Sequence, residues 1–282
     1  MNIGINYQQL FESMCKEGDL DDAKKLYEIN PTIDISASNE EAFTRSCQSG
    51  RLDVAKWLYE IKPTIDIRAD DEEAFGFSCE NGHLDVAKWL YEIKPTIDIS
   101  ADDDYAFKMS CINGHLDIAK WLYEIKPTID INTNGGYAFR WSCLDGHLDV
   151  AKWLYEIKPN IDIDIDIDID DIFLFSCQFG YLDVAKWLYE IKPTIDISAD
   201  DEEVFRWSCQ FGHLDVVKWL YEIKPTINIS ADDEYAFKWS CKYGHLDVAK
   251  WLYEIKPTIN ISANDEYAFK WSCKKSHLDV AK

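Results

Sequence analysis

The apolar residues of this chain recur in one 14-residue stretch that has the spacing of a helix. It reads Gly-His-Leu-Asp-Val-Ala-Lys-Trp-Leu-Tyr-Glu-Ile-Lys-Pro at Gly82–Pro95, Gly146–Pro159 and Gly244–Pro257. Near-copies begin at Gly50, Gly114, Gly180 and Gly212, and a degenerate copy begins at Gly18. Such self-similarity predicts a repeat architecture, because a unit this small cannot bury an apolar face alone and must stack on its neighbours.

One repeat, residues 230–257, shows the elements that we expect in each copy. Small polar and acidic residues at 230–234 are typical of a helix start, where the helix dipole favours acids. A short helix follows to Tyr243 and ends at Gly244, a usual residue past a helix end. Its inner face should carry Phe237, Ser240 and Cys241.

The second helix of the repeat should run from about His245 to Ile255 and present a wide apolar arc, as expected of a helix with neighbours on both sides. The arc consists of Leu246, Ala249, Leu252 and Tyr253, with Val248, Trp251 and Ile255 beside them. Pro257 prevents continuation of the helix. The alternation around Ile259 and Ile261 then predicts a short extended finger.

The nine cysteines measure the period, because each lies 32 residues after the previous one, apart from a single step of 34. We therefore expect one all-α repeat solenoid over 1–282, with about nine stacked helix-turn-helix units and short extended fingers. Residues 1–36 form an N-terminal cap in this interpretation, since Asp22 and Lys25 stand where later copies have apolar residues. Residues 268–282 form an incomplete last unit, which leaves Phe269 and Trp271 without cover.

The stretch Gly-His-Leu-Asp-Val-Ala-Lys-Trp-Leu closely resembles the second-helix signature of ankyrin repeats, Gly-His-Leu-Glu-Val-Val-Lys-Leu-Leu. The resemblance covers essentially the whole chain. The Thr-Pro-Leu-His start of the family's first helix is absent, and a finger-tip glycine survives only at Gly135-Gly136, so regular β-hairpin fingers are in question. The near-identical copies look like the viral ankyrin arrays of giant DNA viruses of amoebae. Tetratricopeptide arrays are the alternative fold, but they lack an Ile-Asp-Ile finger.

The spacing of the cysteines argues against disulfides and zinc, because equivalent positions on packed helices lie about 8–10 Å apart and no Cys-x-x-Cys pair occurs. We expect nine reduced, mostly buried thiols and hence a reducing, intracellular compartment, the cytoplasm or a host cell's cytoplasm. The six histidines share one position in the repeat and should touch the preceding finger.

The acidic composition, with a net charge of −23, disfavours nucleic acid and anionic membranes as partners. The apolar runs are too short to span a bilayer, and the first residues do not read as a secretory signal.

The segment Ile161–Asp171 carries the two extra residues of the 34-residue step and six aspartates. A calcium loop is one interpretation, but the segment lacks a turn that would bring the oxygens together. An expanded surface loop and an edge strand are the others, and we expect the segment to bulge from the stack.

Motifs for nucleotide binding, metalloprotease chemistry and nucleophilic catalysis are absent from the sequence. Charged residues recur in most copies, whereas an active site needs one asymmetric constellation. We therefore expect no enzyme activity, no cofactor and no metal.

Variation between copies is more informative than repetition, and it concentrates in the two residues before each turn glycine. The second of them is small and polar in early copies and then becomes Phe179, Phe211 and Tyr243. In ankyrin-like arrays these positions line the concave binding surface. The resemblance therefore implies a partner-binding site made of Gln178, Phe179, Gln210, Phe211, Lys242 and Tyr243. The alternative is that each ring folds back on the neighbouring helices.

These patterns favour a non-enzymatic protein-interaction scaffold, here a monomer, that binds a protein partner through its concave face. If the chain is viral, the partner belongs to the host. The alternative is an adaptor whose effector domain follows Lys282.

Overall fold

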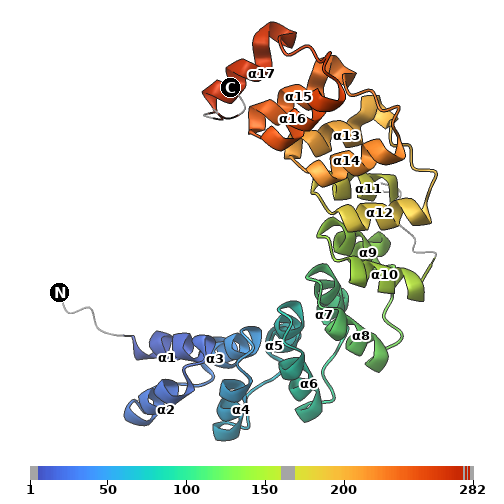
Figure 1. Ribbon diagram of the computed structural model, residues 1–282. Coiled ribbons are helices and arrows are strands. Elements are labelled where there is room, and N and C mark those ends of the chain that lie inside the picture. The colour runs from blue at the N-terminus through green and yellow to red at the C-terminus, as the bar shows by residue number, and fades with distance from the viewer. Residues whose placement is uncertain (1–5, 160–168, 276, 278, 280–282) are drawn as a thin grey trace, which may run out of the picture. The chain divides into compact units, whose positions relative to one another are not determined.

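The structure is a computed structural model that describes residues 6–159, 169–275, 277 and 279. The secondary structure of these residues consists of 17 helices and contains no strand, which confirms the all-α repeat fold (Figure 1). The first helices of the repeats are α1 (Tyr7–Glu17), α3 (Ala37–Gln48), α5 (Ala69–Glu80), α7 (Ala101–Ile112), α9 (Thr133–Leu144), α11 (Ile169–Gln178), α13 (Ala199–Phe211), α15 (Ala231–Tyr243) and α17 (Ala263–Lys274).

The second helices are α2 (Leu20–Ile29), α4 (Leu52–Ile61), α6 (Leu84–Ile93), α8 (Leu116–Ile125), α10 (Leu148–Ile157), α12 (Leu182–Ile191), α14 (Leu214–Ile223) and α16 (Leu246–Ile255). The described residues form two compact bodies. The first body contains α1–α8 and the second contains α11–α17, while α9 and α10 contribute residues to both. Within each body, successive first helices pack against one another.

The turn between the two helices of a repeat is closed by its glycine. Gly82 has a φ of 82°, a left-handed conformation that glycine adopts without steric cost. The turn places the backbone N–H of His83 2.8 Å from the carbonyl oxygen of Ser78, a bond that satisfies one of the last carbonyls of α5. The chain therefore reverses direction within two residues, as the sequence predicts.

Most second helices bury a stripe of three residues, which in α16 are Val248, Ala249 and Leu252. The predicted arc was too wide at its edges, because Tyr253 is 49% exposed and Ile255 is 39% exposed. The tyrosine at this position packs on the tryptophan of the next repeat, so Tyr253, in the last helix pair that the structure describes, has no such ring to cover it.

Successive repeats interlock through this tryptophan, which contacts a tyrosine ring of the repeat before it and, at most junctions, a phenylalanine ring of that repeat as well. The tyrosine contacts have ring centroids 5.5 to 6.1 Å apart and interplanar angles near 84°, and they join Tyr27–Trp57, Tyr59–Trp89, Tyr91–Trp121, Tyr123–Trp153, Tyr189–Trp219 and Tyr221–Trp251. The phenylalanine contacts, at 6.1 to 6.2 Å, join Phe11–Trp57, Phe43–Trp89, Phe75–Trp121, Phe107–Trp153 and Phe173–Trp219. Edge-on rings at these separations attract one another beyond the area that they bury.

A buried serine at the same position of several first helices forms a second connection between successive repeats. Ser78 donates its hydroxyl hydrogen to the carbonyl oxygen of Ala74 at 2.6 Å, and the carbonyl oxygen of Cys47 in the previous repeat lies 3.3 Å away. Ser46, Ser110, Ser142 and Ser208 make the same pair of contacts. A fully buried hydroxyl is therefore satisfied in each of these repeats, as burial requires.

The expected helix start at the acidic residues was wrong in its geometry. In five repeats three residues, Asp232, Asp233 and Glu234 in one of them, have φ between 48° and 68° and form a left-handed turn. The turn aims the glutamate at the next finger, where Glu234 accepts the backbone N–H of Asn260 at 3.3 Å. Glu40, Glu72 and Glu202 make equivalent bonds to Asp66, Asp98 and Asn228. Left-handed backbone costs about 1–2 kcal/mol per residue, and these bonds offset part of that cost.

The fingers lie in extended or turn conformations, and the described residues contain no hairpin strands. Both isoleucines of most fingers are buried, for example Ile65 and Ile67, so the fingers belong to the core.

The chain ends differ from the middle. Asp22 and Lys25 are exposed and form an ion pair of 2.9 Å, whereas Phe269 in α17 is 53% exposed. The segment 160–168, which includes most of the predicted loop Ile161–Asp171, lies outside the described residues.

Candidate protein-binding face

The three predicted aromatic residues lie at equivalent ends of three successive first helices in the second body. Phe211 and Tyr243 are the last residues of α13 and α15, and Phe179 directly follows α11. Their exposed fractions are 49% for Phe179, 41% for Phe211 and 44% for Tyr243. We call this set the aromatic row. Because α11 packs on α13 and α13 packs on α15, the row is carried by neighbouring helices.

Two members of the row rest on an aromatic residue one helical turn earlier. The rings of Phe175 and Phe179 are stacked at 6.4 Å, and those of Trp239 and Tyr243 are stacked at 5.6 Å. Tyr235 extends the second stack at 5.2 Å from Trp239. The row is therefore the outer edge of a larger aromatic surface, since Phe175, Trp239 and Tyr235 are themselves only half-buried.

Lys242 lies among aromatic rings and not simply beside the row as a free polar neighbour. Its Nζ is 3.5 Å from the ring centroid of Trp239 and 5.0 Å from that of Trp271. It also donates to the hydroxyl of Tyr267 at 3.1 Å. A cation over ring faces is attracted by their quadrupoles, so Lys242 joins α15 to α17.

The two glutamines of the predicted site differ in their partners. The Oε1 of Gln210 accepts a hydrogen bond from the hydroxyl of Tyr235 in the next repeat. The Oε1 of Gln178 is buried and has no hydrogen-bond partner in the structure. The repeat after Gln178 carries Glu203 where the next one has Tyr235, and an ionised carboxylate has no hydrogen to donate.

The aromatic neighbours of the row were missed by the sequence analysis, although a signal for them exists. Tyr235, Trp239 and Tyr243 are spaced by four residues, which places them on one face of a helix. Tyr267 and Trp271 repeat the first two positions in α17. The prediction considered only the two residues before each glycine and thus found the edge of this surface.

Five of the six histidines lie against the turn glycine of the preceding repeat, and their predicted contact with the preceding finger stays a prediction. A Cβ on Gly50 would lie 2.5 Å from Nδ1 of His83, and one on Gly212 would lie 2.3 Å from Nδ1 of His245. Burial lowers the pKa of both histidines. In the described part of the chain no three His, Cys, Asp or Glu side chains gather in a way that could hold a metal ion.

All nine cysteines carry free thiols in the described residues, and eight of them are buried. Cys273 is exposed, an exception to the predicted burial, because no second helix covers α17 in the described part of the chain. Burial raises the pKa of Cys241 to about 12, although the hydrogen bond with Ser240 lowers it. The thiol is the main form at neutral pH, whereas nucleophiles and metal ligands need the thiolate.

None of the described helices combines the length and apolar character that are needed to cross a membrane. A search of curated proteins found no match. A family model of ankyrin repeats in three copies matches residues 173–265, and a second one, of ankyrin repeats in many copies, matches residues 77–123. Ankyrin repeats in general mediate protein–protein interaction, and proteins built from them are typically non-enzymatic scaffolds. Residues 77–123 and 173–265 therefore match ankyrin repeats, and the stacked helical repeats described above are consistent with an ankyrin solenoid.

Proposed function

We propose that this chain is a non-enzymatic scaffold that binds a protein partner through the aromatic row, on the face that is concave in ankyrin-like arrays. The observation that carries the proposal is the row itself: three large rings at one repeat position, each more than 40% exposed. Exposed aromatic surface that continues from repeat to repeat marks an interaction site more often than scattered single residues do.

Aromatic residues suit this role because they bury a large contact area while few rotatable side-chain bonds become fixed on binding. Phenylalanine and tyrosine have only two side-chain torsions, so little conformational entropy is lost when a partner covers them. Phe179 and Tyr243 are also held by stacking on their own helices, which reduces that loss further. Gln178, Gln210 and Lys242 supply polar atoms beside the rings, as the rim of an interface usually does.

The test is a triple substitution, Phe179→Ser, Phe211→Ser and Tyr243→Ser, assayed with the full chain. Proteins captured on the wild-type chain are identified by mass spectrometry, and the purified partner is then titrated against both chains. We expect the triple variant to weaken binding at least about a hundredfold, because aromatic anchors dominate interface energetics. Its melting temperature should change little, since the rings lie at the surface.

The matched control is Tyr253→Ser on α16, where the ring is as exposed as that of Phe179 but lies on a second helix. This variant should bind the partner as the wild type does. Equal binding by the triple variant would refute the proposal. A large fall in its melting temperature would instead show that the rings hold the stack together.

Three finer points belong to the same proposal. The eight buried free thiols support a reducing compartment such as the cytoplasm. Most second helices bury an apolar stripe within the array itself, which supports a monomer. A host protein as the partner follows only from the resemblance to viral arrays. Sedimentation of the purified chain would decide the second point, and the identity of the captured protein would decide the third.

A further inference from the structure

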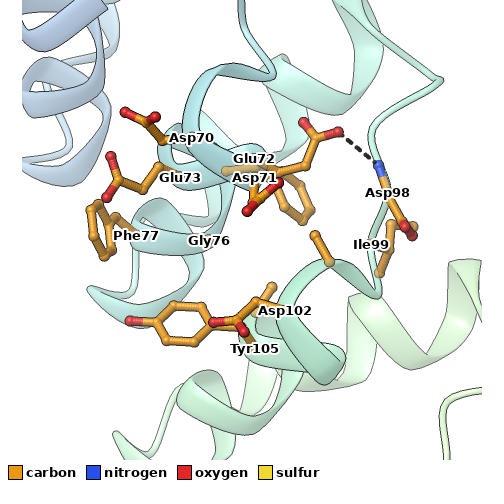
Figure 2. Close-up of a pocket in the computed structure, with 13 residues that line it drawn as sticks. Asp70, Asp71, Glu72, Glu73, Gly76, Phe77, Asp98, Ile99, Asp102 and Tyr105 are labelled. Carbon is orange, nitrogen blue, oxygen red and sulfur yellow. Dashed lines mark hydrogen bonds between the residues drawn. The ribbon is translucent and has the colours of Figure 1, made fainter. Parts of the chain in front are cut away.

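A pocket of about 300 Å³ lies in the first body between α5 and α7, at the place where Gly76 faces the ring of Tyr105 (Figure 2). A Cβ on Gly76 would lie 3.2 Å from Cδ1 of Tyr105, so the ring forms one wall of the pocket. Asp70 and Glu73 line it from α5, and Asp102 lines it from α7. The pocket thus combines an aromatic face with carboxylates from two helices.

The same position four repeats further along the chain is filled by Arg206. Residues 69–73 and 199–203 are identical, Ala-Asp-Asp-Glu-Glu, so the two repeats provide a direct comparison. The guanidinium carbon of Arg206 lies 4.9 Å from the ring centroid of Tyr235. Its Nη1 donates to Oδ2 of Asp232 at 2.8 Å, and its Nη2 donates to the backbone carbonyl of Asp200 at 2.9 Å.

Each group that holds Arg206 has a counterpart around Gly76. Tyr105 corresponds to Tyr235, Asp102 to Asp232 and Asp70 to Asp200, and these three residues line the pocket. The hydrogen bond of the tyrosine hydroxyl is also present in both repeats. Tyr105 donates to Glu80 at 2.7 Å, and Tyr235 donates to Gln210. The first body therefore has the binding groups for a guanidinium but, at Gly76, not the side chain that would supply one.

The pocket also carries unbalanced negative charge. Burial raises the pKa of Glu73, and the nearby charges of Asp70 and Glu41 raise it further. Glu72, which is 4% exposed, lines the pocket as well, and its buried Oε2 has no hydrogen-bond partner in the structure. Its other oxygen accepts the backbone N–H of Asp98 (Figure 2) and pairs with Nε of Arg68 at 2.7 Å, so the charge of Glu72 is partly compensated and the negative charge of the pocket rests mainly on Asp70, Glu73 and Asp102. In the described residues, the ion pairs do not include Asp102, whereas Asp232 pairs with Arg206.

We propose that the Gly76 pocket binds the guanidinium of an arginine side chain presented by a partner protein. The ring of Tyr105 takes the flat face of the guanidinium, and Asp102 with the carbonyl of Asp70 accepts its N–H groups. A planar, delocalised cation fits this combination better than an ammonium does, because it stacks and donates at fixed angles. The proposal concerns the first body and does not depend on the aromatic row.

The first experiment titrates the full chain, labelled with ¹⁵N-glycine, with the peptide acetyl-Ser-Gly-Arg-Gly-Ser-amide. The chain has 12 glycines, and the Gly76 signal is the one that disappears in Gly76→Arg. We expect the arginine peptide to shift this signal saturably. The citrulline peptide, of the same shape but uncharged, should leave it in place, and the lysine peptide should bind several times more weakly. Equal effects of arginine and citrulline would overturn the proposal, and equal affinity for lysine would overturn its assignment to guanidinium.

The second experiment separates the pocket from the general attraction of an acidic chain. Asp102→Asn should lower the affinity for the arginine peptide about tenfold, because a charge-assisted hydrogen bond is lost. Asp117→Asn, which removes the same charge from the exposed side of α8, should leave it unchanged. Equal affinities in these two variants would contradict the proposal.

The third experiment removes Arg206, the arginine that fills the equivalent site in the second body. It keeps the proposal testable if Gly76→Arg folds poorly. Arg206→Gly should open a second pocket, so a new glycine signal at position 206 should appear and shift with the arginine peptide. A new signal that ignores the peptide would show that Tyr235, Asp232 and the carbonyl of Asp200 do not hold a free guanidinium, and the comparison behind the proposal would fail.

Discussion

The contact between a histidine and the turn glycine before it acts at the scale of single residues, and pH can probe it. The rings of His83 and His245 cover Gly50 and Gly212 so closely that a Cβ on either glycine would overlap them. The glycine is thus required twice, once for its positive φ and once for the space that the ring uses. Tyr181 takes the histidine position over Gly146 in another repeat, which shows that a neutral ring also fits.

We predict that the stability of the chain falls as the pH drops from about 7.5 to about 5.5 and that these histidines contribute to the fall. Burial lowers the pKa of His83 and His245 in the folded state, so the unfolded chain binds more protons below the ordinary value of 6.5. Their contribution is complete above pH 6.5 and is lost as the pH falls through the lowered values. The double variant His83→Tyr, His245→Tyr should show a smaller drop in melting temperature over this range, and an unchanged drop would contradict the prediction.

At the scale of the helix pair, most of the fold could be predicted from the sequence. The glycine and proline positions bound the helices, and the apolar spacing gave their inner faces to within one or two residues. The left-handed turn at Asp232–Glu234 could not be predicted, because acids also favour an ordinary helix start. What distinguishes the two is a bond from Glu234 to the finger of the next repeat, which no local pattern contains.

The candidate site was predictable to a similar degree. Comparison of the copies identified Phe179, Phe211 and Tyr243 as variable positions near a turn. The aromatic rings around Lys242 come from two repeats. The pocket at Gly76 exists because this repeat lacks a side chain at the position where a later repeat has Arg206. Such features arise from stacking and from differences between copies, so a single repeat does not reveal them.

The interlocking tryptophan is the element on which we expect stability to depend most. Trp121 contacts Phe75 and Tyr91 of the previous repeat, and the Nζ of Lys88 lies 6.0 Å from its ring centroid. Trp121→Ala should lower the free energy of unfolding by about 3 kcal/mol, measured by urea denaturation with far-UV circular dichroism. The control Tyr253→Ala, at an exposed ring, should cost less than about 0.5 kcal/mol. Similar losses in both variants would show that the interlock contributes little.

At the scale of the whole molecule, the reactivity of the nine cysteines shows how often the packed repeats separate from one another. Eight are buried at equivalent positions of successive repeats, and Cys273 on α17 is exposed. Each buried thiol lies inside a repeat that has neighbours or a paired helix, so it becomes accessible only when the stack opens. A thiol reagent therefore samples the array along its full length.

We predict that one thiol per chain reacts quickly with an aromatic disulfide reagent under native conditions. That thiol is Cys273, and Cys273→Ser should remove the fast phase. The other eight should react only in denaturant, because burial shields them and also raises their pKa. Fast labelling of several cysteines in the native chain would show that the repeats open readily.

The interlock has a consequence for how the gene can change. Every junction in which Trp57, Trp89 or Trp121 takes part uses the same residue types from the same two positions of the preceding copy. If recombination deletes or duplicates one whole copy, the two repeats that become neighbours form a junction from the same residue types as these junctions. The length of the protein can thus drift in steps of one copy without repair of its interior. Selection is then left to act on surface differences such as glycine or arginine at positions 76 and 206.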